Sequence, residues 1–289
     1  MTRRRTSVFD VMNALVLSGI AATTVLPFVY VFAGSLAGEA EISARPFFLW
    51  PRNVVTSTYR YIFATNGAFV RSLVVTIGVT AVGTLVHLAL TFTMAYPLSK
   101  RFLPGRNLLL SLVVFTMIFG GGLIPLYLVV RNLGLLDSYW ALILPGAISP
   151  FYLIIVKNFF QELPVELQEA ASIDGCTELG VFWRIVLPLS KPILATMALF
   201  FAVGIWNDFM SPLLYISKPS MWTLQMFVRQ VTVSPDVNST LGVDDPNILP
   251  PEQGLKFAVI VVATLPILLM YPFLQKYFAK GMLIGSVKG

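Results

Sequence analysis

The chain has 289 residues, of which 56% are hydrophobic and 12% are charged, and its mean hydropathy is +0.79. Soluble domains carry about 25% charged residues, so this composition excludes an ordinary soluble protein and indicates a membrane protein. The net charge of +6 is explained by membrane topology, and we expect no nucleic-acid partner. A single cysteine, Cys176, and a single histidine, His87, exclude an intramolecular disulfide and a Cys- or His-rich metal site.

Six apolar segments reach the length of about 20 residues that a bilayer-spanning helix needs. They cover residues 11–36, 72–98, 108–130, 139–156, 193–216 and 257–278. The first follows Arg3, Arg4 and Arg5, as in a signal peptide, but it is well beyond the usual length of about 7–15 residues. We therefore expect a retained helix followed by five further spans.

The Lys and Arg residues set the orientation, because they are enriched in cytoplasmic segments. With both termini in the cytoplasm, the inside segments hold twelve of them and the outside segments hold eight, mostly in or beside two long loops. The short segment 100–106, with Lys100, Arg101 and Arg106, decides the matter. This topology places the loop after the fourth span in the cytoplasm.

Glycine and proline residues interrupt the third and fourth spans. Residues 120–122 are glycines followed by Pro125, and Pro145-Gly146 precedes Pro150. A broken backbone inside the bilayer needs a protein or water partner. Such paired breaks can mark a transport site or hinge, or they can be kinks that only improve packing, and the sequence leaves both open.

Between the fourth and fifth spans, residues 162–190 form a charged and regularly patterned stretch. Pro164 suits the first turn of a helix, and Gly175 can end that helix in a left-handed conformation. Thr177 can then cap a second short helix, which we expect to stop before Pro188. The stretch therefore predicts a helical hairpin.

The first helix of this hairpin has two distinct faces. Glu166 and Glu169 lie on an acidic face, and Ala170 and Ala171 lie on a face of small residues. Another protein can approach such a surface closely. We expect its contacts to involve acidic, small and apolar positions of the hairpin: Glu166, Glu169, Ala170, Ala171, Asp174, Gly175, Ile185, Leu187 and Pro188.

The hairpin has the complete spacing E-A-A-x3-G-x9-I-x-L-P, from Glu169 to Pro188. This pattern resembles the EAA loop of the inner-membrane subunits of ABC importers, and the resemblance implies that these hairpin residues contact an ATPase subunit in the cytoplasm. The segment from Lys280 to Gly289 resembles the end of MalG-like subunits, the second membrane subunit of maltose-type importers. The resemblance covers nearly the whole chain and points to the carbohydrate branch, closest to subunits that serve oligosaccharides from complex and sometimes acidic polysaccharides.

The resemblance implies an all-α integral membrane fold with six transmembrane helices. An amino-terminal helix precedes the five-helix core of type I, MetI-like importers. Residues 1–70 then hold the cytoplasmic N-terminus, the first helix and the first outer loop. Residues 71–280 form the core with its coupling loop at 162–190, and 281–289 form a cytoplasmic tail. The implied location is the bacterial cytoplasmic (inner) membrane, as a multi-pass protein with both termini in the cytoplasm.

The resemblance also implies partners. They are a second homologous permease subunit in a heterodimer, two ATP-binding subunits and an extracytoplasmic solute-binding protein, with membrane lipid around them and an oligosaccharide as cargo. No G-x-x-x-x-G-K-[ST] segment occurs in the sequence, so the chain has no Walker A loop. We therefore expect a permease subunit that is not an enzyme and holds no cofactor, with ATP and Mg bound by the partner ATPase subunits.

Trp206, Asn207 and Asp208 form the outstanding polar cluster within the spans, and Tyr152 is a further candidate for the translocation path. A carboxylate near mid-membrane costs about 2.5–3.5 kcal/mol on insertion scales and normally faces the protein interior or a water-filled cavity. The indole can stack on a sugar face while the two polar side chains bind hydroxyls. Alternatively, the cluster bonds to neighbouring helices and holds the bundle together, and the resemblance favours this second interpretation.

Two further segments have roles that the resemblance implies. The outer loop 217–256 would contact the binding protein, and its polar, Pro-rich composition disfavours a packed domain, although composition alone equally allows a passive connector. Its candidate contact residues are Asp236, Asn238, Asp244 and Asp245. The tail would insert between the two ATPases through Gly285, Ser286, Val287, Lys288 and Gly289.

The main alternative is an ion-coupled secondary transporter or channel for a small polar solute, working without ATP. It requires a network of titratable side chains in the spans, where the sequence offers Asp208 and His87. A membrane-embedded enzyme would need clustered histidines or carboxylates at one membrane face, and the sequence shows no such cluster.

Overall fold

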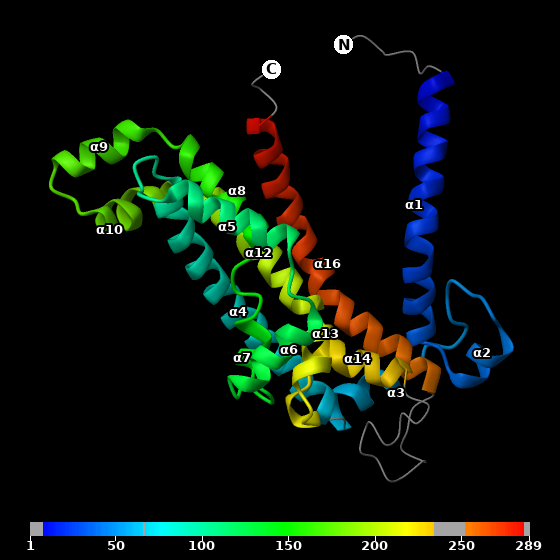
Figure 1. Ribbon diagram of the computed structural model, residues 1–289. Coiled ribbons are helices and arrows are strands. Elements are labelled where there is room, and N and C mark those ends of the chain that lie inside the picture. The colour runs from blue at the N-terminus through cyan, green and yellow to red at the C-terminus, as the bar shows by residue number, and fades with distance from the viewer. Residues whose placement is uncertain (1–7, 66, 234–251, 286–289) are drawn as a thin grey trace. The chain divides into compact units, whose positions relative to one another are not determined.

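The computed structural model describes residues 8–65, 67–233 and 252–285, and all regular elements among them are helices, which confirms the all-α prediction (Figure 1). The long and medium helices are α1 (Val8–Ser35), α4 (Gly67–Ser99), α5 (Arg106–Ile118), α6 (Leu123–Asn132), α8 (Pro150–Glu162), α9 (Val165–Ile173), α12 (Lys191–Asn207), α14 (Leu224–Val233) and α16 (Glu252–Gly285). Short helices are α2 (Glu39–Ala44), α3 (Ser57–Arg60), α7 (Trp140–Ile143), α10 (Glu178–Val181), α11 (Leu187–Leu189) and α13 (Met210–Tyr215). Tyr61–Thr65 and Phe182–Val186 form π-helical turns, and Pro219–Met221 forms a 3₁₀ turn.

Three of the described helices, α1, α4 and α16, are long and apolar enough to cross a membrane. Two bent pairs also qualify if each counts as one span: α5 with α6, and residues 178–189 with α12. The described helices therefore supply three to five candidate spans by length and composition. This is consistent with the six spans that we predicted, and the number six stays a prediction.

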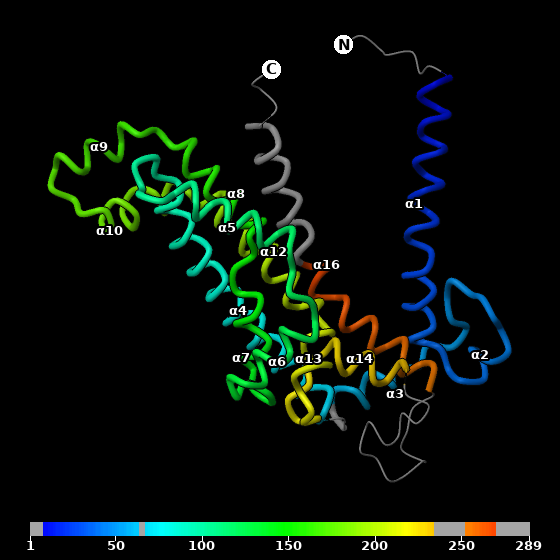
Figure 2. The backbone as a smooth tube through the Cα atoms, viewed as in Figure 1, coloured from blue at the N-terminus to red at the C-terminus, as the bar shows by residue number. Residues whose placement is uncertain are grey.

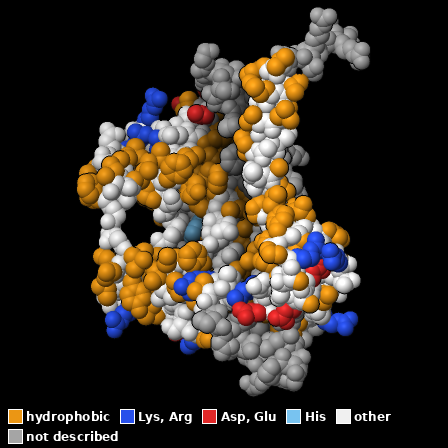
Figure 3. All heavy atoms as spheres, turned by 90° about the vertical axis from the view of Figure 1, so that its right-hand side faces the viewer, with side chains coloured by type: hydrophobic (Ala, Val, Ile, Leu, Met, Phe, Trp, Pro, Cys, Tyr) orange, Lys and Arg blue, Asp and Glu red, His pale blue; other side chains and the backbone are white. Residues whose placement is uncertain are grey.

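The chain divides into two compact units, the first built from residues 1–70 and 228–266. In this unit α1 is exposed along most of its apolar length, and none of its most apolar window is buried. Hydrophobic side chains line this helix where it faces the viewer in Figure 3. Near its end, Gly34 lies so close to the Phe257 ring of α16 that a Cβ atom would stand 2.5 Å from it. We infer that α1 presents its apolar surface to lipid and packs within the unit only near its end.

The first outer loop is held by one carboxylate in the same unit. Glu41 of α2 accepts hydrogen bonds from the Arg52 backbone N–H at 3.0 Å and from the Arg45 guanidinium at 2.6 Å. The Arg52 backbone bond is the main reason why the pKa of Glu41 lies below its ordinary value. This loop therefore has a defined fold rather than serving as an open connector.

The second unit contains residues 71–227 and 267–289, and it carries most of the predicted core. Its larger hydrophobic cluster joins α4, α8, α12 and the loop helices through buried side chains that include Phe92, Leu153, Val156, Phe182 and Met197. A second cluster, near α6, α7 and α13, includes Val79, Val130, Leu142 and Tyr215. The trace in Figure 2 shows α9 and α10 at one end of this unit and α6, α7 and α13 toward the other.

The predicted breaks in the third and fourth spans are present. The third span bends by 114° between α5 and α6, where Gly122 has a φ of +82°, a conformation that favours glycine. The fourth is divided into α7 and α8, and α8 runs to Glu162 instead of ending near residue 156. His87 of α4 is buried, and its Nε2 lies 2.9 Å from the Ile143 carbonyl at the end of α7. A protein group thus satisfies a backbone carbonyl that the break exposes.

Two expectations about loops need correction. The outer loop 217–256 is packed over its first part, because α14 buries Leu224, Phe227 and Val231 on one side, and the Leu224 N–H donates to Thr76 Oγ1 at 2.7 Å. These apolar residues recur at helical spacing, a pattern hidden by the average composition of the loop. The tail that we placed after residue 280 begins inside a helix, since α16 continues to Gly285.

Candidate functional site

Residues 162–190 form the expected helical hairpin. The first helix, α9, begins after Pro164 and ends at Ile173, and Gly175 follows with a φ of +83°. Thr177 then caps α10, because its side-chain oxygen accepts a hydrogen bond from the Gly180 N–H at 3.2 Å. The predictions for Gly175 and Thr177 are confirmed, and together they fix the turn between the two helices.

The second helix of the hairpin does not stop before Pro188, so that expectation is wrong. The helical path continues from α10 through the π-helical turn Phe182–Val186 into α11, and Pro188 lies in the first turn of α11. A proline removes one hydrogen bond from the ladder of such a path, and Pro188 follows directly on the π-helical turn. The path bends by 80° at Ser190 before α12 begins.

The hairpin exposes its acidic positions. Glu166, Glu169 and Asp174 are exposed, as is Ala170 beside them, whereas Ala171 is 7% exposed and belongs to the larger hydrophobic cluster. We expected both alanines to let another protein approach closely. Ala171 instead packs against other side chains of this chain, and of the two only Ala170 is exposed. The remaining predicted positions range from the half-buried Ile185 and Leu187 to the exposed Gly175 and Pro188.

A hollow of about 790 Å³ lies between α9 and the end of α4. Its lining combines basic and acidic side chains, among them Lys100, Arg101, Glu166 and Glu169. Lys100 donates a 2.7 Å hydrogen bond to Gln168 Oε1 of α9. Nothing in the sequence pattern indicated this link, because the two residues are far apart in the chain.

The polar cluster predicted at the end of the fifth span is satisfied by local bonds. Asn207 donates to the Val203 carbonyl of its own helix at 2.9 Å. Asp208 Oδ1 accepts from the Met210 and Ser211 N–H groups at 3.0 and 3.1 Å, so it caps the first two N–H groups of α13 from one position before its N-cap residue, Phe209. The expected bonds from these two side chains to neighbouring helices are replaced by bonds to adjacent backbone. Trp206 is 8% exposed.

A cavity of about 380 Å³ nevertheless brings three of the four path candidates together. Tyr152, Asn207 and Asp208 line it, joined by His87 of α4 and by two serines that sequence reasoning missed, Ser149 and Ser211. The Tyr152 ring stacks on Phe200 at 5.7 Å and meets Phe201 edge-on at 5.2 Å. Ligand pockets typically measure about 300–1,000 Å³ and combine aromatic walls with a few fixed polar groups. The cavity has this character.

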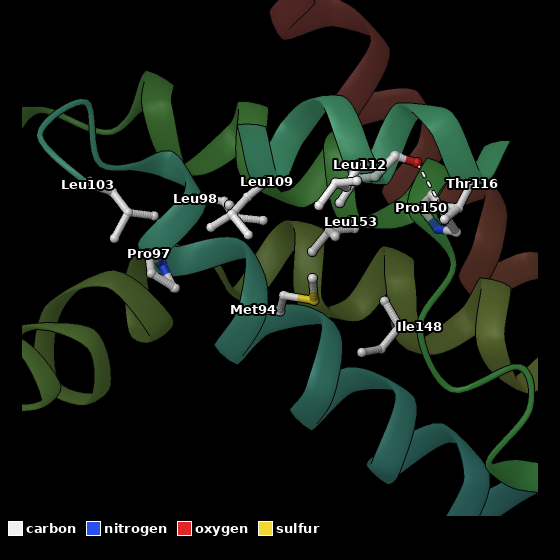
Figure 4. A pocket seen from close by; sticks show the side chains of 11 residues that line it. Met94, Pro97, Leu98, Leu103, Leu109, Leu112, Thr116, Ile148, Pro150 and Leu153 are labelled. Carbon is white, nitrogen blue, oxygen red and sulfur yellow. Dashed lines mark hydrogen bonds between the residues drawn. The ribbon is translucent and has the colours of Figure 1, made fainter. Parts of the chain in front are cut away.

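A second cavity offers a contrast. It measures about 540 Å³ and lies between α4, α5 and α8, where side chains including Met94, Leu112 and Leu153 line it (Figure 4). Thr116 supplies a hydroxyl, but this hydroxyl donates to the Val113 carbonyl at 2.8 Å. The cavity therefore lacks the polar groups that orient a sugar and suits hydrocarbon instead.

Two groups of predicted contact residues lie outside the described residues. They are Asp236, Asn238, Asp244 and Asp245 of the outer loop, and Ser286, Val287, Lys288 and Gly289 of the tail. Gly285 is the last described residue of α16. Their roles stay predictions.

The apolar helices, the helical hairpin and the cavity within the helix cluster are features of a membrane transport protein. Residues 90–284 match the family described as the binding-protein-dependent transport system inner membrane component, and the chain belongs to this family of permease subunits. Membership decides against the ion-coupled alternative.

Individual relatives extend this result. The chain is 64% identical over 282 residues to Protein LplC of Bacillus subtilis, covering 98% of this chain and 95% of that protein. It is 50% identical over 282 residues to the polygalacturonan/rhamnogalacturonan transport system permease protein YtcP of the same organism, covering 97% and 98%. A solved chain from a bacterial ABC transporter involved in the import of the acidic polysaccharide alginate matches with a TM-score of 0.89 and 29% identity, covering 96% of this chain and 99% of that chain.

Proposed function

We propose that this chain is the membrane-spanning permease subunit of an ATP-driven importer for oligosaccharides, with fragments of acidic polysaccharides as its cargo. One observation carries the proposal. The chain is 50% identical, over nearly its whole length, to a permease named for polygalacturonan and rhamnogalacturonan transport. The similar fold in an alginate importer supports the same cargo class. Permeases named for arabinooligosaccharides are less similar, at 28–29% identity.

The cavity beside Asp208 is the proposed place where cargo passes this subunit. Its aromatic wall of Tyr152 and Phe200 suits the apolar face of a sugar ring, and its polar groups suit hydroxyls. An acidic cargo would be repelled by an ionised Asp208 unless a cation lay near it. We therefore propose that the second membrane subunit supplies a basic side chain on the opposite side of the path.

The partners follow from the same proposal. A homologous permease subunit pairs with this chain, two ATP-binding subunits hydrolyse ATP with Mg, and an extracytoplasmic solute-binding protein delivers the sugar. The exposed acidic positions of α9, with Glu169 at their centre, dock on an ATPase in the cytoplasm. Both termini lie on that side of the inner membrane, as the distribution of Lys and Arg favours.

The outer loop and the tail complete the proposed contacts. The loop around residues 236–245 reaches the binding protein, and the tail from Gly285 to Gly289 inserts between the ATPases. Alternating closure of the ATPases then moves the hairpin, and the helix cluster opens in turn to each side of the membrane.

Uptake in cells tests the cargo class. The gene for this chain is deleted and complemented, and uptake of labelled oligogalacturonides is compared with uptake of labelled arabino-oligosaccharides. We expect deletion to abolish uptake of the acidic sugars and complementation to restore it. Loss of arabino-oligosaccharide uptake alone would overturn the acidic cargo, and unchanged uptake of both would overturn the proposed role in sugar import.

A further inference from the structure

One basic side chain connects the end of α4 to both helices of the hairpin. The Lys100 ammonium donates to Gln168 Oε1 of α9 at 2.7 Å, and its Nζ lies 3.4 Å from Glu178 Oε2 of α10. The Lys100 side chain is 16% exposed, whereas the Glu178 side chain is 60% exposed, so solvent weakens the ion pair and the hydrogen bond to Gln168 is the firmer contact. The hairpin is thus attached to α4 on both sides of its turn at Gly175.

Tyr96, one turn earlier on α4, strengthens this attachment. Its hydroxyl donates to the same Glu178 Oε2 at 2.8 Å, and the Lys100 ammonium lies 4.7 Å from the centre of its ring. The Glu178 carboxylate therefore accepts a hydrogen bond from Tyr96 and forms an ion pair with Lys100, and the Lys100 ammonium lies over the face of the Tyr96 ring. Each of the three groups restricts the positions of the other two.

The last turn of α4 needs such support because Pro97 lies inside it. A proline removes one hydrogen bond of the helix ladder and weakens the turn that contains it. Side chains compensate: Arg106 Nε donates to the Leu98 carbonyl at 2.9 Å, and Gln161 Nε2 of α8 donates to the Ser99 carbonyl at 3.2 Å. Side chains thus fix the end of α4 to its surroundings in addition to the backbone bond from the Lys100 N–H to the Pro97 carbonyl at 3.1 Å.

Beyond this turn, α4 is a continuous helix that reaches the proposed cargo cavity. His87, which lines the cavity, is thirteen residues before Lys100 on the same chain segment. At 1.5 Å per residue the two positions are about 20 Å apart along the helix. A displacement of the hairpin can therefore reach the cavity wall through one rigid element.

We propose that Lys100 is a positioning residue that makes the hairpin and α4 move together, so that movement of the ATPases changes the cargo cavity. The proposal rests on the proposed function, in which the outer face of the hairpin contacts an ATPase. Glu169 is exposed and makes no bond to Lys100 within the described residues, whereas Gln168 and Glu178 bind Lys100. Lys100 thus serves the transmission of movement and not the docking itself.

The test uses the complete importer, purified through a tag on this chain and reconstituted in vesicles with its binding protein. Lys100→Met keeps the apolar stem and removes the ammonium. Coupling free energies between sites typically correspond to about 5–150-fold effects, and we expect about a tenfold fall in sugar moved per ATP hydrolysed. Recovery of the ATPase subunits and the basal rate of ATP hydrolysis should stay at the wild-type level. Sugar moved per ATP at the wild-type level would overturn the proposal.

A charge exchange separates positioning from a general loss of structure. In the double variant Lys100→Glu with Glu178→Lys, the ion pair is reversed, Tyr96 can accept from the new ammonium, and the Gln168 amide can donate to the new carboxylate. We expect this variant to recover most of the lost coupling, while each single exchange does not. Lys157→Met is the matched control, because Lys157 makes no hydrogen bond or ion pair within the described residues. A defect of equal size in Lys157→Met would contradict the proposal.

If the Lys100→Met variant fails to assemble, the Gln168→Leu variant tests the proposal instead. This substitution removes the hydrogen bond from Lys100 to α9 and leaves Lys100 beside Glu178. Wild-type coupling in that variant would then overturn the proposal, and a fall of several-fold would support it. The wild-type complex tests the proposed function separately. If it contained no ATPase subunits or moved no sugar, the proposed function would fail whatever the variants did.

Discussion

The hairpin and the junction between α12 and α13 use polar side chains in opposite ways. At the hairpin, bonds join parts that are distant in sequence, from Lys100 to Gln168 and from Tyr96 to Glu178, separations of 68 and 82 residues. At the junction, Asn207 and Asp208 bond to backbone within four residues. Long-range bonds connect elements that can move, whereas short-range bonds fix the local shape of one element.

The surroundings of the two regions explain the difference. Lipid offers no hydrogen-bond partner, so a polar group in a span is best satisfied by nearby backbone that is always present. Outside the hydrocarbon region, polar side chains can reach across to distant elements, where such bonds make separate elements move together. The comparison therefore assigns the transmission of movement to the hairpin and a fixed cargo surface to the junction, and substitutions at four positions test it.

The largest effect is expected from Gly175→Leu. A bulky residue resists the φ of +83°, and strain of this kind amounts to about 1–3 kcal/mol. The turn would relax and displace α10 from α9, so the ATPase should be lost from the complex. Recovery of ATPase subunits with the tagged chain measures this. Gly78→Ala is the control, because Gly78 lies in α4 with open space around it. Normal ATPase recovery by Gly175→Leu would show that the hairpin turn does not shape the docking surface.

Glu169→Ala should have the next largest effect. Removing one partner of a buried charge pair costs about 2–5 kcal/mol, and Glu169 is exposed in this chain, available for such a pair with an ATPase. We expect weaker binding of the ATPase without a change in the thermal stability of the permease. A titration of purified ATPase subunit against the permease in detergent measures the affinity, with Asp174→Ala as a neighbouring acidic comparison. Equal affinity for wild type and Glu169→Ala would remove this residue from the interface.

His87→Leu should destabilise the contact between α4 and the end of α7 without affecting docking. The substitution leaves the Ile143 carbonyl without its partner in an apolar environment, which costs about 1–3 kcal/mol. We expect a lower melting temperature, with ATPase recovery unchanged. His87→Gln can still donate to the carbonyl, so its melting temperature should lie between those of the wild type and His87→Leu. A melting temperature equal to that of the wild type would mean that the break at α7 is satisfied in another way.

The smallest effects are expected at Asp208, and they separate its two roles. Asp208→Ala removes the cap of α13 and should cost about 0.5–2 kcal/mol, whereas Asp208→Asn keeps an equally good cap and should leave the melting temperature nearly unchanged. If Asp208 also faces the cargo, Asp208→Asn should still alter the uptake of acidic relative to neutral oligosaccharides. Unchanged uptake and stability in Asp208→Asn would leave capping as its sole role.

The hairpin shows what the sequence can and cannot predict. Gly175 and Thr177 act on their immediate neighbours through backbone conformation and capping, so their roles could be predicted from residue type and spacing. The passage of the helix through Pro188 could not, because it depends on the π-helical turn before it, which has no sequence signal. Lys100, Tyr96 and Glu178 meet through tertiary folding, and no spacing rule connects them.

The junction shows a different limit. Asp208 lies just before a short helical segment, where a carboxylate can bind the first free N–H groups, so this local signal was present in the sequence, but we expected bonds to neighbouring helices instead. The cavity itself combines α4, α8 and α12, and its serines are unremarkable in sequence. Residue types therefore predicted the polar cluster, and packing decided which of its members share a cavity.

The most direct test of the account measures sugar accumulation in vesicles that contain the purified complex. Labelled oligogalacturonide and the binding protein are supplied on one side, and ATP with Mg on the other. The account predicts accumulation that requires ATP, the binding protein and an intact hairpin, and that stops in Gly175→Leu. Accumulation driven by an ion gradient in the absence of ATP, or full activity in Gly175→Leu, would contradict it.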